Sequence, residues 1–215
     1  MTISNMVKLV KSNTFLAEAL ELSKEMHKKT LTMIEDCWAA VENGDKKLAD
    51  RVITSDEEID NLDTKIRTKV LQYLSSMPDG GNVTLSLTLL DISTYLERTA
   101  DHAVSIAESS LRFPQLTDGS YQKQLLDLKQ LVIKVGNGAR VSFKESDPEK
   151  AKQVLTDVET AKRIFFDIVD SIREDKKITH SQAIYKWTIA HELRRMTQYA
   201  KNIALNVLEP YPEAK

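Results

Sequence analysis

The sequence predicts an all-α protein made of two tandem antiparallel three-helix bundles that are related by internal duplication. Three observations support this fold class. Glycine and proline are scarce, with six and five copies in a chain of 215 residues. Apolar residues recur at helical spacing between these few turn-forming residues. The second half of the chain also aligns with the first. An all-β sandwich or a Rossmann-type fold is disfavoured, because both need many tight turns rich in glycine and proline.

Three long helices are expected in the first half of the chain. The first covers about 14–43 and ends at Gly44, where the helical pattern of apolar residues stops. The second covers about 46–76 and follows Asp45, whose side chain is a typical N-cap. The third covers about 82–112, where leucine, isoleucine and alanine again recur at helical spacing.

The second half is expected to repeat this arrangement. Its helices cover about 120–146, 148–174 and 180–209. Asp147 followed by Pro148 is typical of a helix start, because proline at the first helical position removes an N–H group that has no partner within the helix. This half therefore supplies a second set of three helices.

The six helices divide into two repeats at 14–113 and 118–210. Residues 1–13 are expected to form an N-terminal arm or an extra helical turn. Gly136 and Gly138 lie inside the predicted fourth helix, and each is unfavourable there by about 1 kcal/mol relative to alanine. They indicate either a close helix crossing or a local kink.

The internal duplication is supported by a gapless alignment of about forty residues, which runs across parts of the first two helices of each half. It pairs Met26 with Leu128, Asp45 with Asp147, Val52 with Val154 and Ile66 with Ile168. The third helix aligns with the sixth when the alignment is shifted by a few residues relative to that of the first two helices, and this pairs Leu96 with Leu193. The offset falls in a loop, where insertions and deletions are tolerated. Two bundles related by duplication follow from this match.

Acidic residues distinguish the first repeat from the second. Asp56, Asp60 and Asp63 are spaced i, i+4 and i+7 on the second helix, and therefore share one face. Glu97 and Asp101 are spaced i and i+4 on the third helix. The aligned positions of the second repeat hold no acid, and are occupied by Val158, Lys162, Phe165, Arg194 and Gln198.

These acidic faces predict a metal site, with a solvated surface as the alternative. Stacked carboxylates repel each other unless a cation neutralises them. Oxygen-rich sites suit magnesium, calcium and manganese, and also iron. The candidate metal ligands are Asp56, Asp60, Asp63, Glu97 and Asp101. The alternative is an ordinary solvated acidic face, since Lys65, Arg67 and Arg98 are interspersed with these acids.

Charge, cysteine content and hydropathy exclude several classes of protein. The net charge of −2 disfavours a basic nucleic-acid-binding protein. The single cysteine, Cys37, excludes an internal disulfide framework and a cysteine-based zinc finger, and a small buried side chain is the expected role. No apolar stretch is long enough to span a membrane, and the first residues do not resemble a signal peptide. A cytoplasmic protein is expected.

One segment resembles a known family. Residues 96–108, LERTADHAVSIAE, closely resemble the Leu-Glu-Arg-x-x-Asp-His-Ala-x-x-Ile-Ala-Glu signature of the PhoU family of phosphate-uptake regulators. The segments LADRVI at 48–53 and DEEID at 56–60 resemble the second helix of that family. The resemblance is strong over about 26–112 and weaker over about 120–208.

The resemblance implies a function as well as a fold. Proteins of this family are non-enzymatic negative regulators of phosphate uptake that act on a phosphate transporter, a sensor histidine kinase, or both. Their acidic motifs are associated with divalent or transition metal ions, iron clusters among them. Arg194 and Gln198 depart from the acidic motif, so the resemblance implies one metal site in the first repeat and at most a single one in the second. A homodimer is expected, with no nucleic acid and with membrane contact only through partners.

Three other functions remain open. A metal-dependent phosphohydrolase with carboxylate-bound metal would need Asp101, although the sequence shows no general base for it. A histidine phosphotransfer module would carry its phosphoryl group on His102. Alternatively, this histidine is a metal ligand, a packing residue or a capping residue. A plain helical scaffold is the third alternative.

Overall fold

The structure is a computed structural model of the chain, and it describes residues 14–77, 82–113 and 119–210. These residues form helices and no strands, which confirms the predicted all-α class. The helices are α2 (Thr14–Asn43), α3 (Lys46–Ser76), α4 (Val83–Arg112), α5 (Gly119–Glu145), α6 (Pro148–Glu174) and α7 (His180–Leu208). The N-terminal arm expected at 1–13 lies outside the described residues.

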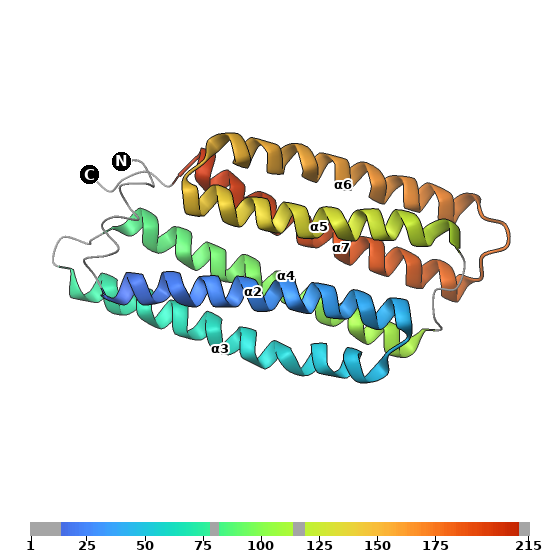
Figure 1. Cartoon of the computed structure of the whole chain (residues 1–215), viewed down its shortest axis with the longest axis horizontal. Helices are drawn as coiled ribbons and strands as arrows, with labels where there is room; N and C mark the ends of the chain where they lie inside the picture. The colour runs from blue at the N-terminus through green and yellow to red at the C-terminus, as the bar shows by residue number, and fades with distance from the viewer. Residues whose placement is uncertain (1–13, 78–81, 114–118, 211–215) are drawn as a thin grey trace.

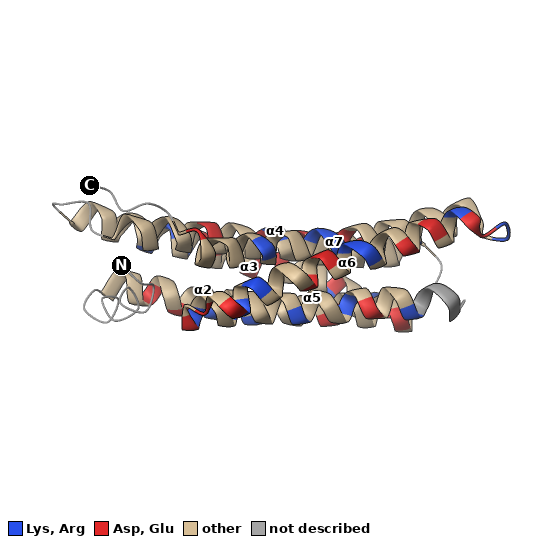
Figure 2. Cartoon of the chain, turned by 90° about the horizontal axis from the view of Figure 1, so that it is seen from above, with Lys and Arg blue, Asp and Glu red and all other residues tan. Residues whose placement is uncertain are grey.

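The helices form two bundles that lie side by side. Helices α2, α3 and α4 pack on one another, and α5, α6 and α7 do the same. Figure 1 shows the blue-to-green bundle next to the yellow-to-red bundle, with their long axes running in the same direction. Helix α4 packs along α7 and joins the bundles, whereas α2 meets α5 over a short stretch. Figure 2 shows α2 and α5 on the same side of the molecule.

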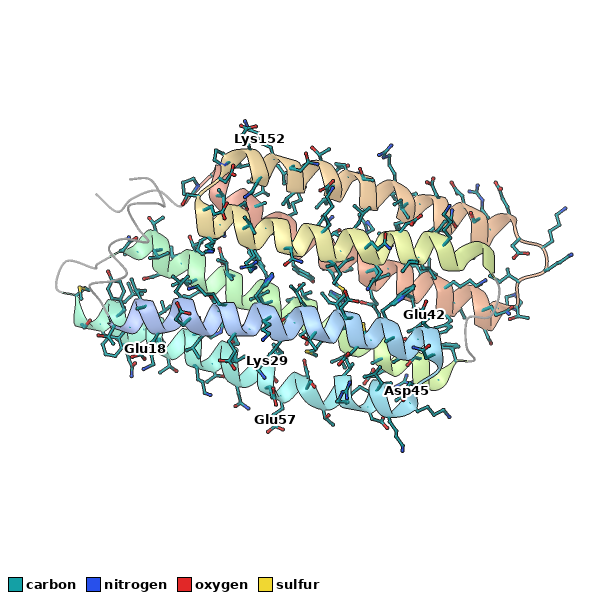
Figure 3. All side chains as sticks on the ribbon, in the orientation of Figure 1. Glu18, Lys29, Glu42, Asp45, Glu57 and Lys152 are labelled. Carbon is teal, nitrogen blue, oxygen red and sulfur yellow. The ribbon has the colours of Figure 1, made fainter. Side chains whose placement is uncertain are left out.

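The turn after the first helix has the same geometry in both bundles. Gly44 has a φ of 63°, and the aligned Ser146 has a φ of 53°. The next residue in each case caps the following helix: Asp45 accepts a hydrogen bond from the backbone N–H of Leu48 (3.0 Å), and Asp147 accepts one from Glu149 (3.0 Å). The label of Asp45 in Figure 3 marks this turn in the first bundle. The duplication in the sequence is therefore matched by a duplication in the backbone.

Apolar residues at the predicted positions fill both bundles. The largest fully buried apolar side chains include Met26, Ile59, Leu89, Ile106, Leu128, Ile168, Ile189 and Leu193. Cys37 is fully buried and its thiol donates to the backbone carbonyl of Ile34 (3.2 Å), so it has the expected role of a small core residue. None of the helices in the described part of the chain is long and apolar enough to cross a membrane.

The two glycines of α5 mark close packing. Helix α5 continues through Gly136 and Gly138 without a break. A Cβ atom on Gly138 would lie 2.9 Å from Cγ2 of Val154 on α6, which is closer than real Cβ contacts. A Cβ on Gly136 would lie 3.6 Å from Cδ2 of Leu31, an ordinary contact. Of the two interpretations of this pair, the close helix crossing is the correct one at Gly138.

Candidate functional site

The predicted acidic residues lie on the α3–α4 pair. Asp56, Asp60 and Asp63 project from α3, and Glu97 and Asp101 project from α4, which packs against α3. Asp63 and Glu97 are partly buried, with exposed fractions of 16% and 25%, whereas Asp60 is exposed. The alternative of a solvated acidic face therefore describes Asp60, whereas Asp63 and Glu97 are shielded from solvent.

The carboxylates influence one another across the two helices. Burial raises the pKa of Asp56 above its ordinary value, and the negative charges of Asp60 and Asp101 raise it further. Because Asp56 and Asp101 belong to different helices, this effect shows that the α3 and α4 acids face a common region. A raised carboxyl pKa means that the ionised form lacks sufficient compensation there.

The pKa of Glu97 on α4 is also raised by burial and by neighbouring acids. Burial is the largest cause that raises its pKa, followed by the charge of Asp101 and then by those of Asp63 and Asp60. Arg98 opposes these effects. We name the five residues Asp56, Asp60, Asp63, Glu97 and Asp101 the acidic cluster.

Two cationic side chains accompany the acidic cluster. Arg67 donates from Nε to Oδ2 of Asp63 (2.5 Å) and from Nη2 to Oγ1 of Thr94 (2.9 Å), which links α3 to α4. Arg98 lies 3.4 Å from Glu97 and 3.3 Å from Asp101. Both arginines are about half exposed, so each ion pair contributes little to stability. The five acids exceed the two arginines, and the region is anionic.

The acidic cluster contains two buried oxygen atoms without a hydrogen-bond donor. Oδ1 of Asp56 and Oδ1 of Asp63 have no partner among the described residues. A buried carboxylate oxygen that lacks a partner is costly, by about 1–3 kcal/mol or more. Such oxygens fit a cation bound between α3 and α4. In the side-chain arrangement seen here, however, no group of three or more histidine, cysteine or acidic residues in the described chain is assembled to hold a metal ion.

The equivalent face of the second bundle carries a cationic and an aromatic side chain at positions where the first bundle has acids. The guanidinium of Arg194 on α7 lies 5.1 Å from the ring centroid of Phe165 on α6. In the sequence alignment these residues correspond to Glu97 and Asp63, which also face each other across a helix pair. A cation–π contact therefore occupies the place of an acidic contact. Val158 and Phe165 have no side-chain oxygen that could ligate a metal ion, and both are buried.

His102 joins the two bundles. Its Nδ1 contacts Oε2 of Glu192, and its Nε2 lies 3.2 Å from the hydroxyl of Tyr199, both on α7. Arg195 donates to the same hydroxyl (2.9 Å). Both ring nitrogens are thus engaged, and the side chain is only 18% exposed. The sequence identified His102 but gave no sign of its partners, because they belong to the other repeat.

An exposed apolar group on the second bundle was not predicted. Phe166, Ile184 and Trp187 are 49%, 56% and 44% exposed. The indole of Trp187 stacks on the ring of His191 with 4.7 Å between centroids. Trp187 lies on the surface, whereas Trp38 is buried. Only the departure of Ile184 and Trp187 from the buried stripe of α7 could have indicated this.

Comparisons with known proteins show which family this chain resembles. Residues 23–110 match the model of the PhoU domain. The phosphate-specific transport system accessory protein PhoU homolog 1 of Thermotoga maritima is 29% identical over 187 residues, covering 81% of this chain and 78% of that protein. The PhoU homolog of Clostridium acetobutylicum is 28% identical over 169 residues, covering 71% of this chain and 76% of that protein.

Two solved structures share the fold. The crystal structure of PhoU from Pseudomonas aeruginosa matches with a TM-score of 0.82 at 20% identity, covering 91% of this chain and 96% of that one. PhoU from Streptococcus pneumoniae matches with a TM-score of 0.81 at 19% identity, covering 91% and 95%. The fold is thus that of a PhoU-type double helical bundle. The chain is PhoU-like in sequence and in fold, which confirms the resemblance noted at 96–108.

Proposed function

We propose that this chain regulates phosphate uptake as a non-catalytic helical adaptor that acts in the cytoplasm on a phosphate transporter. The observation that carries the proposal is the PhoU-domain match at 23–110, which contains the whole acidic cluster. The relatives are named as accessory proteins of a phosphate-specific transport system. An accessory protein works through its surfaces, and this chain offers two distinct ones: the acidic cluster and the exposed apolar group around Trp187.

The acidic cluster is proposed to bind divalent or transition metal ions, iron among them. Asp56, Asp60, Asp63, Glu97 and Asp101 would supply the oxygen ligands after their side chains adjust. The two unpartnered oxygens and the raised pKa values support this assignment. When bound, the metal supplies positive charge that offsets the repulsion between the carboxylates. By ligating one ion from both helices, these carboxylates would hold α3 against α4.

The adaptor is proposed to use its apolar group for the transporter. Phe166, Ile184 and Trp187 remain exposed on α6 and α7. If they form one contiguous patch, such a patch marks a protein contact. A sensor histidine kinase and a second copy of the chain are further proposed partners. Loss of partner binding in Trp187→Ala, measured by co-purification with the transporter, would support the assignment of this surface.

The alternative functions make different predictions. A histidine phosphotransfer module needs an accessible histidine, whereas the ring nitrogens of His102 contact Glu192 and Tyr199. A phosphohydrolase predicts metal-dependent turnover of a phosphate ester that is lost in Asp101→Ala. The adaptor predicts no such turnover in either protein. Both proteins can be assayed with the same ester after loading with manganese or iron.

The metal proposal is tested by elemental analysis of the full chain. The double variant Asp56→Asn, Asp63→Asn removes the charges of the two residues with unpartnered oxygens. Glu57→Gln is the matched control, since Glu57 is exposed at the outer edge of α3 (Figure 3). The wild type and Glu57→Gln are expected to retain metal, and the double variant is expected to lose it. Equal metal content in all three proteins would contradict the assignment.

The regulatory proposal is tested separately by phosphate uptake. Cells that lack the chain are expected to take up more phosphate than cells that contain it, and the wild-type chain is expected to restore the lower rate. An uptake rate that is the same with and without the chain would contradict the regulatory function even if the metal site were correct.

A further inference from the structure

A cavity of about 170 Å³ lies between the two bundles. Residues from α2, α4, α5 and α7 line it, so both repeats contribute. It forms where α2 and α5 are adjacent on the same side of the molecule but contact each other over a short stretch (Figure 2). The acidic cluster lies elsewhere, on the α3–α4 pair.

The cavity carries an excess of positive charge. Lys24 on α2 and both Arg140 and Lys144 on α5 line it. Lys24 pairs with Glu21 (2.5 Å), but no ion pair of Arg140 or Lys144 is found within the described chain. Two cations beside one cavity repel each other and favour the arrival of an anion.

A buried imidazole also contributes to the polar side of the cavity lining. His27 lines the cavity and is only 7% exposed, and its Nε2 has no hydrogen-bond partner among the residues described. Burial and the charge of Arg140 lower its pKa to about 4, while a hydrogen bond with Asn137 opposes this shift. The imidazole is therefore neutral near pH 7. An unpartnered buried ring nitrogen calls for a ligand or a water that bonds to it.

The rest of the lining is apolar apart from Ser23, whose hydroxyl donates to the backbone carbonyl of Leu20 (2.8 Å). Leu20 comes from α2, Ile92 and Leu96 from α4, Phe143 from α5 and Ile203 from α7. An apolar cavity of roughly 150 Å³ accommodates benzene. A space of this size, with apolar walls and two cations at one helix, suits a compact organic molecule better than a fully hydrated inorganic ion, whose desolvation would be costly.

We propose that this inter-bundle cavity binds a small organic anion whose charged head group lies at Arg140 and Lys144. The compact apolar body of the anion contacts Ile92, Phe143 and Ile203, and a polar atom of the ligand bonds to Nε2 of His27. The head group compensates the cations of α5, and the body fills the gap between α2 and α5. Binding therefore stabilises the contact between the bundles, independently of the acidic cluster and of any partner.

Four probes separate the parts of this proposal. Phenyl phosphate and benzoate carry an anionic head on an apolar body, inorganic phosphate lacks the body, and benzyl alcohol lacks the charge. Binding to the full chain is measured by calorimetry, and contact is located by the ring resonances of His27 in NMR spectra. Phenyl phosphate or benzoate is expected to shift the His27 signals and to bind at least tenfold more tightly than either control probe.

Variants locate the head group. Arg140→Gln and Lys144→Gln are each expected to weaken binding by about tenfold, because each removes a charge-assisted hydrogen bond to the head group. Lys123→Gln is the matched control, since Lys123 is exposed on the same helix outside the cavity. Ile203→Phe fills the cavity and is expected to abolish binding. Lys144→Gln remains informative if Arg140→Gln fails to fold.

Several outcomes would overturn the proposal. If neither organic anion shifts the His27 signals, the cavity is not a binding site. Equal affinity for phenyl phosphate and inorganic phosphate would exclude a role for the apolar walls. Equal affinity for benzoate and benzyl alcohol would exclude a role for the cations. Binding that survives both Lys144→Gln and Ile203→Phe would show that the probes bind somewhere else.

Discussion

Protonation of His27 is expected to destabilise the protein as the pH falls. The pKa of His27 is lowered from 6.5 to about 4, because burial and the charge of Arg140 disfavour the imidazolium. In the unfolded chain the histidine has its ordinary pKa and binds a proton more strongly. The unfolded state therefore takes up more protons between about pH 6.5 and pH 4, and the free energy of unfolding decreases over this window.

The size of this effect follows from the pKa difference. One pKa unit corresponds to about 1.36 kcal/mol, so the full difference is about 3 kcal/mol below pH 4. At about pH 5 the expected loss is about 2 kcal/mol relative to neutral pH. His27 is almost fully buried, so solvent does not screen this contribution strongly. A loss of this size is a substantial part of the stability of a typical domain, which is about 5–15 kcal/mol.

Urea denaturation of the wild type and of His27→Gln isolates the effect of this one histidine. The free energy of unfolding is measured at about pH 7, 6 and 5 by circular dichroism. The difference between wild type and variant is expected to change by about 2 kcal/mol over this range, with the wild type losing more stability. His180→Gln serves as the control, since His180 is exposed. Parallel pH profiles for wild type and His27→Gln would refute the reasoning.

Three further predictions concern single residues. Asp56→Asn is expected to raise the melting temperature of the metal-free protein, because it removes one repelling charge. The variant is also expected to lose the stabilisation that added manganese is expected to give the wild type. Thermal melts of both proteins with and without manganese measure the two effects. Gly136→Ala is expected to stabilise the protein by up to about 1 kcal/mol. Gly138→Ala is expected to stabilise it less or to destabilise it, because the added Cβ would lie too close to Val154. Urea denaturation of both variants measures the difference, and equal effects would contradict the close contact. Ser146→Gly is expected to stabilise by about 0.5–1 kcal/mol because its φ of 53° is unfavourable for serine, with no gain expected if the turn relaxes in solution.

The helices were predictable from local chemistry. The second helix was expected at 46–76 after the N-cap Asp45, and the structure has α3 at Lys46–Ser76 with that cap in place. The start of α4, both ends of α5 and the end of α7 each differ from the prediction by one residue. This agreement arises because helix starts and stops depend on capping residues and on glycine, all of which are visible in the sequence.

Contacts between the bundles were not predictable in the same way. Spacing within one helix placed Asp56, Asp60 and Asp63 on a common face, and the structure has them there. The same spacing gives no information about a residue on another helix. His102 contacts Glu192, and His27 lies near Arg140, only because α4 docks on α7 and α2 approaches α5. Those contacts depend on the relative position of two duplicated units.

The two bundles have kept one backbone geometry while their faces have diverged. The turns at Gly44 and Ser146 are equivalent, and yet acids face each other on α3 and α4 where Arg194 covers Phe165 in the second bundle. Helix α4 connects this difference to the bundle interface. Asp101 belongs to the acidic cluster, and the next residue, His102, holds α7, about 100° further around the helix. The proposed metal would draw α3 and α4 together and would thus act on the helix that joins the bundles. We therefore expect metal-free and metal-loaded protein to differ at the α4–α7 contact too.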